Sequence, residues 1–171
     1  MSNAVVDLRP VTEHDLDLWE TARGSRDGTG AFQWFGHTPV HAIRRRLAED
    51  GLLTADGGML AVWHDDEPVG RVEWWASSWG RPATSSCWTI AIGLLDGHRG
   101  RGIGTAAQTA LVEYLFDHTR AERIQASTDA LNVAERRALE RSGFELEGIV
   151  RRGQWREGAW HDQALYSVLR P

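Results

Sequence analysis

The chain has 171 residues, a length that favours one domain spanning residues 1–171. Apolar residues make up 42% and charged residues 25% of the sequence, so disordered and fibrous classes are excluded. The net charge of −5 argues against a nucleic-acid partner, since nucleic-acid-binding domains are basic. No apolar run approaches the roughly 20 residues that span a bilayer, and the N-terminus lacks the regions of a signal peptide. We therefore expect a cytoplasmic protein without a membrane partner.

The basic, cysteine and histidine residues exclude several chemistries. The 19 basic residues are all Arg, so no lysine base, Schiff base or P-loop lysine is present. Cys87 is the single cysteine, which excludes an intrachain disulfide and a cysteine-based zinc site, and we expect it to be a small buried residue in a strand. The seven His show no metal-ligand spacing. No metal site is therefore expected.

The N-terminal part of the chain is predicted to contain a strand and two helices. Residues 4–9 have the composition of a short strand. Thr12 and Asp15 resemble a capping box that begins a helix. Residues 24–36 form a Gly-rich loop with three aromatic side chains, and Pro39 predicts the first turn of a second helix.

The middle of the chain changes to a strand-like period. Residues 59–64, 68–77 and 87–95 are apolar and aromatic runs joined by short connections, which predicts an antiparallel meander. A glycine-rich loop then leads into a predicted helix over residues 105–118, with apolar residues on one face.

The C-terminal part predicts a strand, a helix and two further strands. The strand covers residues 123–128, the helix begins at Asn132 and ends before Gly143, and two strands fill residues 145–170. The complete order predicts an α+β fold with a mostly antiparallel central sheet of about seven strands and four helices.

The segment from Arg99 to Gly104, RGRGIG, has the character of an anion cradle. Small residues let the backbone approach a phosphate, and the free N–H groups of the following helical turn point toward it. Arg99 and Arg101 add positive charge. A plain tight turn would need only one glycine, so the three glycines favour an anion site.

The same glycines also fit a dinucleotide fingerprint. Gly102, Gly104 and Ala107 have the required spacing, and Asp129 could serve as its acidic residue. That fingerprint, however, belongs to the first βα turn of a parallel domain. Three meander strands precede it here, so the topology disfavours this alternative.

At these residues the sequence resembles the GNAT superfamily of acyl-CoA-dependent N-acetyltransferases. Arg99, Gly102 and Gly104 match the family signature R/Q-x-x-G-x-G/A. The segment from Asn132 to Phe144 is similar to a block of the subgroup that includes ribosomal-protein N-terminal (alanine) acetyltransferases. The resemblance covers nearly the whole chain. It implies acetyl-CoA as cosubstrate and a split sheet whose fourth and fifth strands diverge to admit the pantetheine arm.

The resemblance also implies which residues contact acetyl-CoA. Backbone groups of Leu94 and Leu95 would pair with the pantetheine amides, and Asn132 would contact the arm. Arg136 and Arg137 would reach the nucleotide end, although a solvated helix face explains them equally well. Backbone N–H groups of six consecutive residues would hold the pyrophosphate: Gly100, Arg101, Gly102, Ile103, Gly104 and Thr105.

One position departs from the family pattern. Many GNAT enzymes carry a tyrosine four residues before the Gly-Phe pair, where it acts as general acid near the CoA sulfur. In this sequence that position is Leu139, which has no proton to donate. Either water protonates the thiolate or another group does so, with Tyr166 as a candidate.

Acetyl transfer to an amine needs a base that takes the amine proton. Glu73 is the first candidate, because strand alternation places it on the same face as Trp75. Its alternative role is an exposed residue or an ion pair with Arg71. Asp129 is the second candidate, and its alternative role is a turn or cap residue.

The tryptophans allow two interpretations. They fill the faces of the sheet as core residues, or Trp34, Trp75 and Trp79 wall an acceptor pocket. An aromatic wall suits a flat or cationic acceptor.

Three functions remain open from the sequence. The first is acetyl transfer from acetyl-CoA to a primary amine of a small molecule. The second is N-terminal protein acetylation of the ribosomal-protein type. The third is a non-catalytic acyl-CoA-binding regulatory module, which Leu139 keeps open. A homodimer is also left open.

Overall fold

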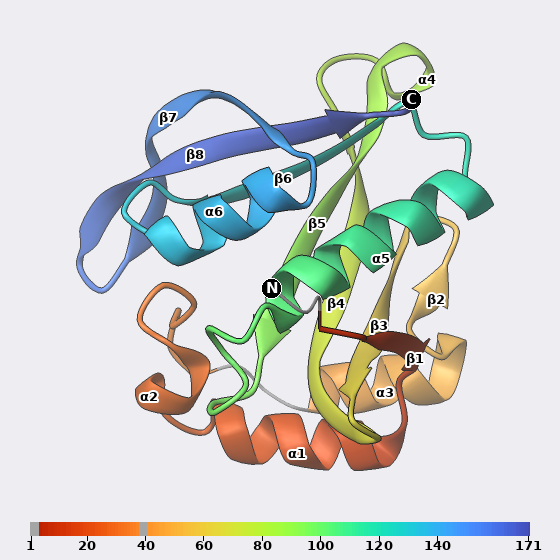
Figure 1. The fold of residues 1–171 in the computed structure, drawn as a ribbon, viewed down its shortest axis with the longest axis vertical. Coiled ribbons are helices and arrows are strands. Elements are labelled where there is room, and N and C mark those ends of the chain that lie inside the picture. Colours follow the sequence, from red (N-terminus) through yellow and green to blue (C-terminus); the bar gives the residue numbers. More distant parts are fainter. Residues whose placement is uncertain (1–3, 38–40) are drawn as a thin grey trace.

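The computed structural model describes residues 4–37 and 41–171, which form eight strands and six helices (Figure 1). The strands are β1 (Asp7–Pro10), β2 (Leu53–Thr54), β3 (Gly57–His64), β4 (Glu67–Ser78), β5 (Ser86–Leu94), β6 (Arg123–Asp129), β7 (Glu145–Arg156) and β8 (Ala159–Leu169). The helices are α1 (Glu13–Arg23), α2 (Arg26–Thr29), α3 (His41–Asp50), α4 (Pro82–Ser85), α5 (Ile103–His118) and α6 (Val133–Arg141). The helix start predicted at Pro39 lies outside the described residues.

All eight strands belong to one sheet. Its order is β1-β3-β4-β5-β6-β8-β7, and β2 pairs with β3. Every pair is antiparallel except β5 with β6. The α+β prediction is confirmed, with one strand and two helices more than expected. The additional elements are β2, α2 and α4, which have only two to four residues each.

Helices cover both faces of the sheet, because side chains alternate along its strands. On β3, Met59 and Ala61 face α1 and bury Trp19, whereas Leu60 and Val62 belong to the core on the side of α5. The start of α1 is fixed by the predicted capping box, in which Thr12 and Asp15 exchange hydrogen bonds.

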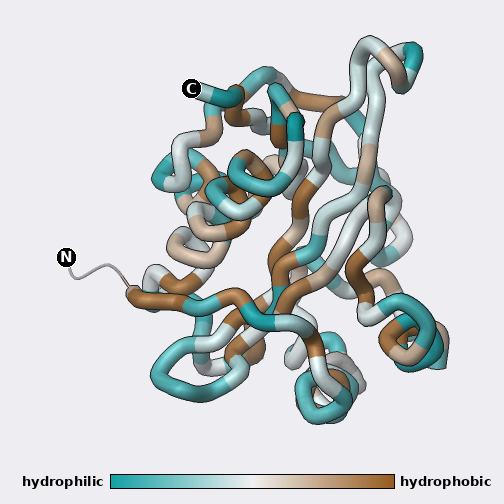
Figure 2. The backbone as a smooth tube through the Cα atoms, turned by 90° about the vertical axis from the view of Figure 1, so that its right-hand side faces the viewer, coloured by the Kyte–Doolittle hydropathy of each residue, from teal (hydrophilic) through white to brown (hydrophobic). Residues whose placement is uncertain are grey.

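The larger core lies between α5 and the central strands. Ile103, Ala107, Leu111 and Leu115 of α5 are fully buried at spacings of four residues. Figure 2 shows apolar stretches where the central strands pass through the interior and hydrophilic stretches in many of the loops. None of the helices in the described ranges is long and apolar enough to cross a bilayer.

The sheet is split between β5 and β6. These two strands pair only at Trp88 with Ile124 and at Thr89 with Gln125. Further along, β5 remains paired with β4, and β6 remains paired with β8. The divergence expected between these strands is therefore present, and it leaves one edge of each strand open.

Candidate active site

A cleft occupies the gap where β5 and β6 diverge. Residues 90–92 of β5 and residues 126–128 of β6 form its two sides. Gln108 of α5 and two side chains of α6 close it from the helix side, and Gln33 enters from the loop after α2. The cleft is therefore built from both halves of the sheet and from a loop distant in sequence.

The glycine-rich loop between β5 and α5 forms an open cradle next to this cleft. Gly97, Gly100 and Gly102 have φ angles of 82°, 73° and 82°, which favour glycine. A Cβ atom on any of the three would meet no heavy atom within 4 Å, so the space beside them is open. No side chain caps the start of α5, and its first N–H groups are free for an anion. In the same loop, Nδ1 of His98 is buried and has no hydrogen-bond partner.

Arg99 ties this loop to its surroundings. Its Nη2 donates to the carbonyl of Gly28 at 2.7 Å and to that of Leu94 at 3.2 Å. The Leu94 carbonyl is therefore engaged by Arg99, while the Leu95 N–H donates to the Val69 carbonyl at 2.9 Å. Arg99 thus connects the cradle to α2.

The next carbonyl along the open edge of β5 belongs to Ile92. It accepts a hydrogen bond from Nε2 of Gln33 at 2.8 Å. Sequence reasoning named neither residue. Strand alternation would have indicated Ile92, since the backbone groups of residues 92 and 94 point to the same edge.

The start of α6 is organised by Asn132. Its Oδ1 accepts from the N–H of Glu135 at 3.2 Å, and its Nδ2 donates to Thr128 at 3.2 Å. Arg136 donates from Nε to the Tyr166 hydroxyl and from Nη1 to the Ala130 carbonyl, each at 3.1 Å. The Arg136 guanidinium therefore forms hydrogen bonds that connect α6 to β8 and to the residue that follows β6.

The two residues considered for thiolate protonation have different environments. Leu139 is buried and lines the cleft. Tyr166 is fully buried, and its hydroxyl donates to Glu140 at 2.9 Å while accepting from Arg136. The Tyr166 hydroxyl proton is therefore already engaged. Arg137 is exposed on α6.

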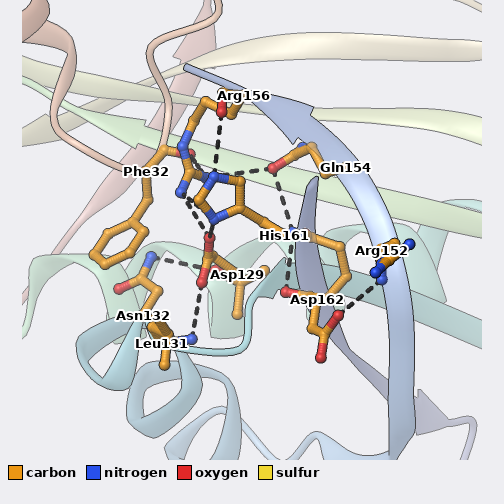
Figure 3. Close-up of polar contacts among 11 residues, drawn as sticks. Phe32, Asp129, Leu131, Asn132, Arg152, Gln154, Arg156, His161 and Asp162 are labelled. Carbon is orange, nitrogen blue, oxygen red and sulfur yellow. Dashed lines mark hydrogen bonds and ion pairs between the residues drawn. The ribbon is translucent and has the colours of Figure 1, made fainter. Parts of the chain in front are cut away.

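Asp129, at the end of β6, is the centre of a buried polar cluster (Figure 3). Its Oδ2 lies 2.7 Å from Nη2 of Arg156 and 3.3 Å from Nδ1 of His161, and its Oδ1 accepts from the Leu131 N–H at 2.8 Å. The side chains of Asp129 and Arg156 are 2% and 4% exposed.

These contacts decide the charge of Asp129. Burial alone would raise its pKa, but the Leu131 N–H and the Arg156 guanidinium outweigh burial and lower the pKa below the usual range. A carboxylate stabilised in this way is a weak proton acceptor. Sequence reasoning missed Arg156 and His161, which are distant from Asp129 in sequence.

The same cluster holds the loop after α2. Nη1 of Arg156 donates to the Phe32 carbonyl at 3.3 Å, and its guanidinium carbon lies 5.4 Å from the centre of the Phe32 ring. Arg26 of α2 also pairs with Glu157 of the β7–β8 hairpin at 2.5 Å. Loop and hairpin are thus joined beside the cleft, into which the neighbouring Gln33 projects.

Glu73 lies one strand away from the cleft. It pairs across the ladder with Ala91, which lines the cleft, and its side chain is 33% exposed. Nη2 of Arg71 lies 3.7 Å from its Oε1, so the ion pair considered from the sequence is present. The structure gives Glu73 access to solvent beside a cation.

The three tryptophans considered for the acceptor pocket lie in different surroundings. Trp75 is 45% exposed on β4. Trp79 donates from Nε1 to Gln125 at 2.9 Å, where β5 and β6 are still paired. Trp34 contacts the ring of His37 at 5.2 Å. In the described part of the chain, no group of three or more His, Cys, Asp or Glu side chains is placed to hold a metal.

Comparison with known proteins agrees with this geometry. Residues 6–145 match the sequence model of a protein family described as an acetyltransferase (GNAT) domain. Comparison with curated proteins gives no match.

Several solved structures share the fold. Spermidine N-acetyltransferase from Vibrio cholerae, in complex with CoA and spermine, is 17% identical, with 96% of this chain and 95% of that chain covered and a TM-score of 0.79. RimJ from Mycobacterium smegmatis, in complex with CoA-disulfide, is 24% identical, with 97% and 82% covered and a TM-score of 0.76. Ribosomal-protein-alanine N-acetyltransferase from Brucella melitensis is 18% identical, with 96% and 99% covered and a TM-score of 0.75.

Proposed function

The chain belongs to the GNAT acetyltransferase family, and on this basis we propose that it transfers an acetyl group from acetyl-CoA to the primary amine of a small molecule. The observation that carries the proposal is the cleft between β5 and β6, which lies beside an uncapped helix start. A cleft at a split in the sheet accommodates an extended arm, and free N–H groups accommodate a pyrophosphate.

The residues present fit acetyl-CoA. The backbone of residues 100–105 holds the pyrophosphate, assisted by the charge of Arg101, and Asn132 donates to Thr128, which lines the cleft. On β5, the Ile92 carbonyl accepts from a pantetheine amide once Gln33 releases it. Bound acetyl-CoA supplies an acetyl group activated as a thioester.

The contacts beside the cleft favour a small acceptor. The Arg26–Glu157 ion pair and the Arg156–Phe32 hydrogen bond join the loop to the hairpin. We infer that this connection limits the size of an acceptor that can approach the cleft. A flexible protein N-terminus needs an open groove to lie in, whereas a small amine does not.

A second candidate, acetylation of a protein N-terminus, is favoured by one of the similar structures. The Brucella melitensis protein is named as a ribosomal-protein-alanine N-acetyltransferase, and 99% of its chain is covered. Both candidates use the same cosubstrate, so they differ in the acceptor alone.

Glu73 is our choice for the base. Its carboxylate is half-buried next to the strand that borders the cleft, and it can take a proton from the amine directly or through water. Asp129 is less suited, since its lowered pKa reduces its affinity for a proton.

The test measures release of free CoA from acetyl-CoA with two panels of acceptors. One panel holds small primary amines, including a diamine, a polyamine and an amino sugar, and the other holds peptides with free N-termini. We expect turnover with a member of the first panel. No turnover with either panel would refute the proposed acetyltransferase activity. Faster turnover with peptides than with small amines would favour acetylation of a protein N-terminus.

The base is tested with Glu73→Gln. We expect the rate to fall by about 10²–10⁴-fold while acetyl-CoA affinity is retained, because glutamine cannot accept the proton. The matched control is Glu67→Gln, at the exposed beginning of the same strand, which should retain the rate. An unchanged rate in Glu73→Gln together with a loss in Asp129→Asn would move the base to Asp129.

A further inference from the structure

The cleft contains a carboxyl group that the reaction described so far does not use. Glu135 lies on α6 one turn before Leu139, and both side chains line the cleft. Residues four apart on a helix share a face, so the two side chains reach the same space. Leu139 has no proton to give, whereas a carboxyl group can donate one.

Glu135 is also the sole titratable side chain among the described residues that line this cleft. The other polar side chains there are two amides and two hydroxyls, and these are Gln33, Gln108, Ser127 and Thr128. An amide or an aliphatic hydroxyl is a much weaker acid than a carboxyl group. Tyr166 does not line the cleft, and its hydroxyl already donates to Glu140.

The carboxyl group of Glu135 is held in position from α5. Nε2 of Gln108 donates to its Oε1, and the Gln108 side chain is itself buried. The Ser142 hydroxyl also lies 3.4 Å from Oε1 of Gln108, and its shorter contacts are with the carbonyls of Ala138 at 2.9 Å and Thr105 at 3.1 Å. Oε2 of Glu135 has no hydrogen-bond partner among the described residues and remains available to a ligand.

The environment favours the protonated form of this group. Burial in the wall of the cleft raises the pKa of Glu135, and the hydrogen bond from Gln108 opposes part of that rise. A general acid has to hold its proton near the working pH, and burial moves a carboxyl group in that direction.

We propose that Glu135 is the general acid that protonates the CoA sulfur as it leaves, in the role that Leu139 cannot fill. This inference rests on the proposed acetyl transfer. The amine nitrogen forms a bond to the acetyl carbon, and the carbon–sulfur bond breaks with the electron pair on sulfur. Sulfur takes the proton of Glu135, Glu73 takes the proton of the amine, and solvent returns one proton from Glu73 to Glu135.

The first test is a rescue experiment. Glu135→Gln keeps the size of the side chain and its contact with Gln108, but it removes the acidic proton. We expect kcat to fall by about 10²–10⁴-fold, with the acetyl-CoA Kd from calorimetry changed by less than about threefold. Adding Leu139→Tyr to this variant should restore at least about tenfold of the loss, since a tyrosine hydroxyl can then donate. The control Glu113→Gln, on the exposed side of α5, should behave as the unaltered protein.

The second test needs no turnover. In the protein without acetyl-CoA, carbon NMR of labelled glutamate carboxyl groups should show one resonance that titrates above the ordinary glutamate pKa and is missing from Glu135→Gln. Titration of this carboxyl at or below the ordinary value would overturn the inference. An unchanged kcat in Glu135→Gln, or a loss explained by weaker acetyl-CoA binding and not rescued by Leu139→Tyr, would overturn it too. Absence of turnover in the unaltered protein would instead refute the proposed function itself.

Discussion

Replacing Arg156 by methionine should destabilise the protein strongly. Arg156→Met keeps much of the apolar stem but leaves the Asp129 carboxylate buried without its cation. Both side chains are nearly inaccessible, at 4% and 2% exposure, so solvent cannot replace the lost partner. Breaking one side of such a buried pair costs about 3–5 kcal/mol. That is a large part of the roughly 5–15 kcal/mol that stabilises an average domain.

The assay is urea unfolding followed by tryptophan fluorescence. The matched control is Arg152→Met, on an exposed residue of the same strand, which should change the free energy of unfolding by less than about 0.5 kcal/mol. Adding Asp129→Asn to Arg156→Met removes the orphaned charge, so the double variant should lose much less than the two single losses together. Equal losses in Arg156→Met and Arg152→Met, or additive losses in the double variant, would refute the reasoning.

Two further predictions concern the cradle and acid stability. Gly102→Glu should abolish acetyl-CoA binding in calorimetry, because it adds bulk and negative charge at a residue whose φ of 82° already disfavours a side chain. The control is Gly148→Ala, where an added Cβ also meets open space. Retained affinity in Gly102→Glu would contradict the assignment of the glycine-rich loop as the pyrophosphate site. Arg123 and Ser167 lower the pKa of Glu147 from 4.5 to about 2, so this carboxylate stabilises the fold above its unfolded pKa and loses that effect as the pH falls toward 2. Glu147→Gln should therefore be less stable than the unaltered protein at neutral pH, and the difference should shrink as the pH falls through about 2. A difference independent of pH would count against this ion pair.

Local signals in the sequence predicted much of the fold. The capping box at Thr12 forms as expected, and α5 buries the apolar face that its spacing indicated. The three strands of the meander pair in chain order, because short connections leave neighbouring strands few other partners. These features depend on residues that are close in sequence.

The missing parts depend on contacts between distant residues. Arg156 reaches Phe32 across 124 positions and Asp129 across 27, and no local pattern records such a contact. The sequence did not indicate the contact of Gln33 with β5, because a glutamine in a glycine-rich loop follows no periodic pattern that would assign it a partner. The elements β2, α2 and α4 are too short for their period to be recognised.

The site residues likewise fall into those that local sequence patterns predict and those that depend on contacts between distant residues. The role of the glycines in the cradle could be predicted from the sequence, since an open backbone turn before a helix needs residues that adopt a positive φ. The environment of Asp129 could not be predicted from the sequence. Its pKa depends on burial, on the Leu131 N–H and on Arg156, which is distant in sequence. Strand alternation predicted that Glu73 and Trp75 share a face of β4, and neither side chain is buried there. The distance of Glu73 from the cleft depends instead on which strand lies next to β4.

The two-residue junction between β5 and β6 also bears on how the protein can move. The chain forms two ladders, β1-β3-β4-β5 and β6-β8-β7, that share two residue pairs and are linked in sequence by α5. A rotation of one ladder against the other would widen the gap without separating any other strand pair, so the cost in broken backbone hydrogen bonds would be small. The larger core, however, includes residues of both ladders and of α5, so side-chain packing, and not backbone pairing, opposes such a rotation and sets the width of the cleft.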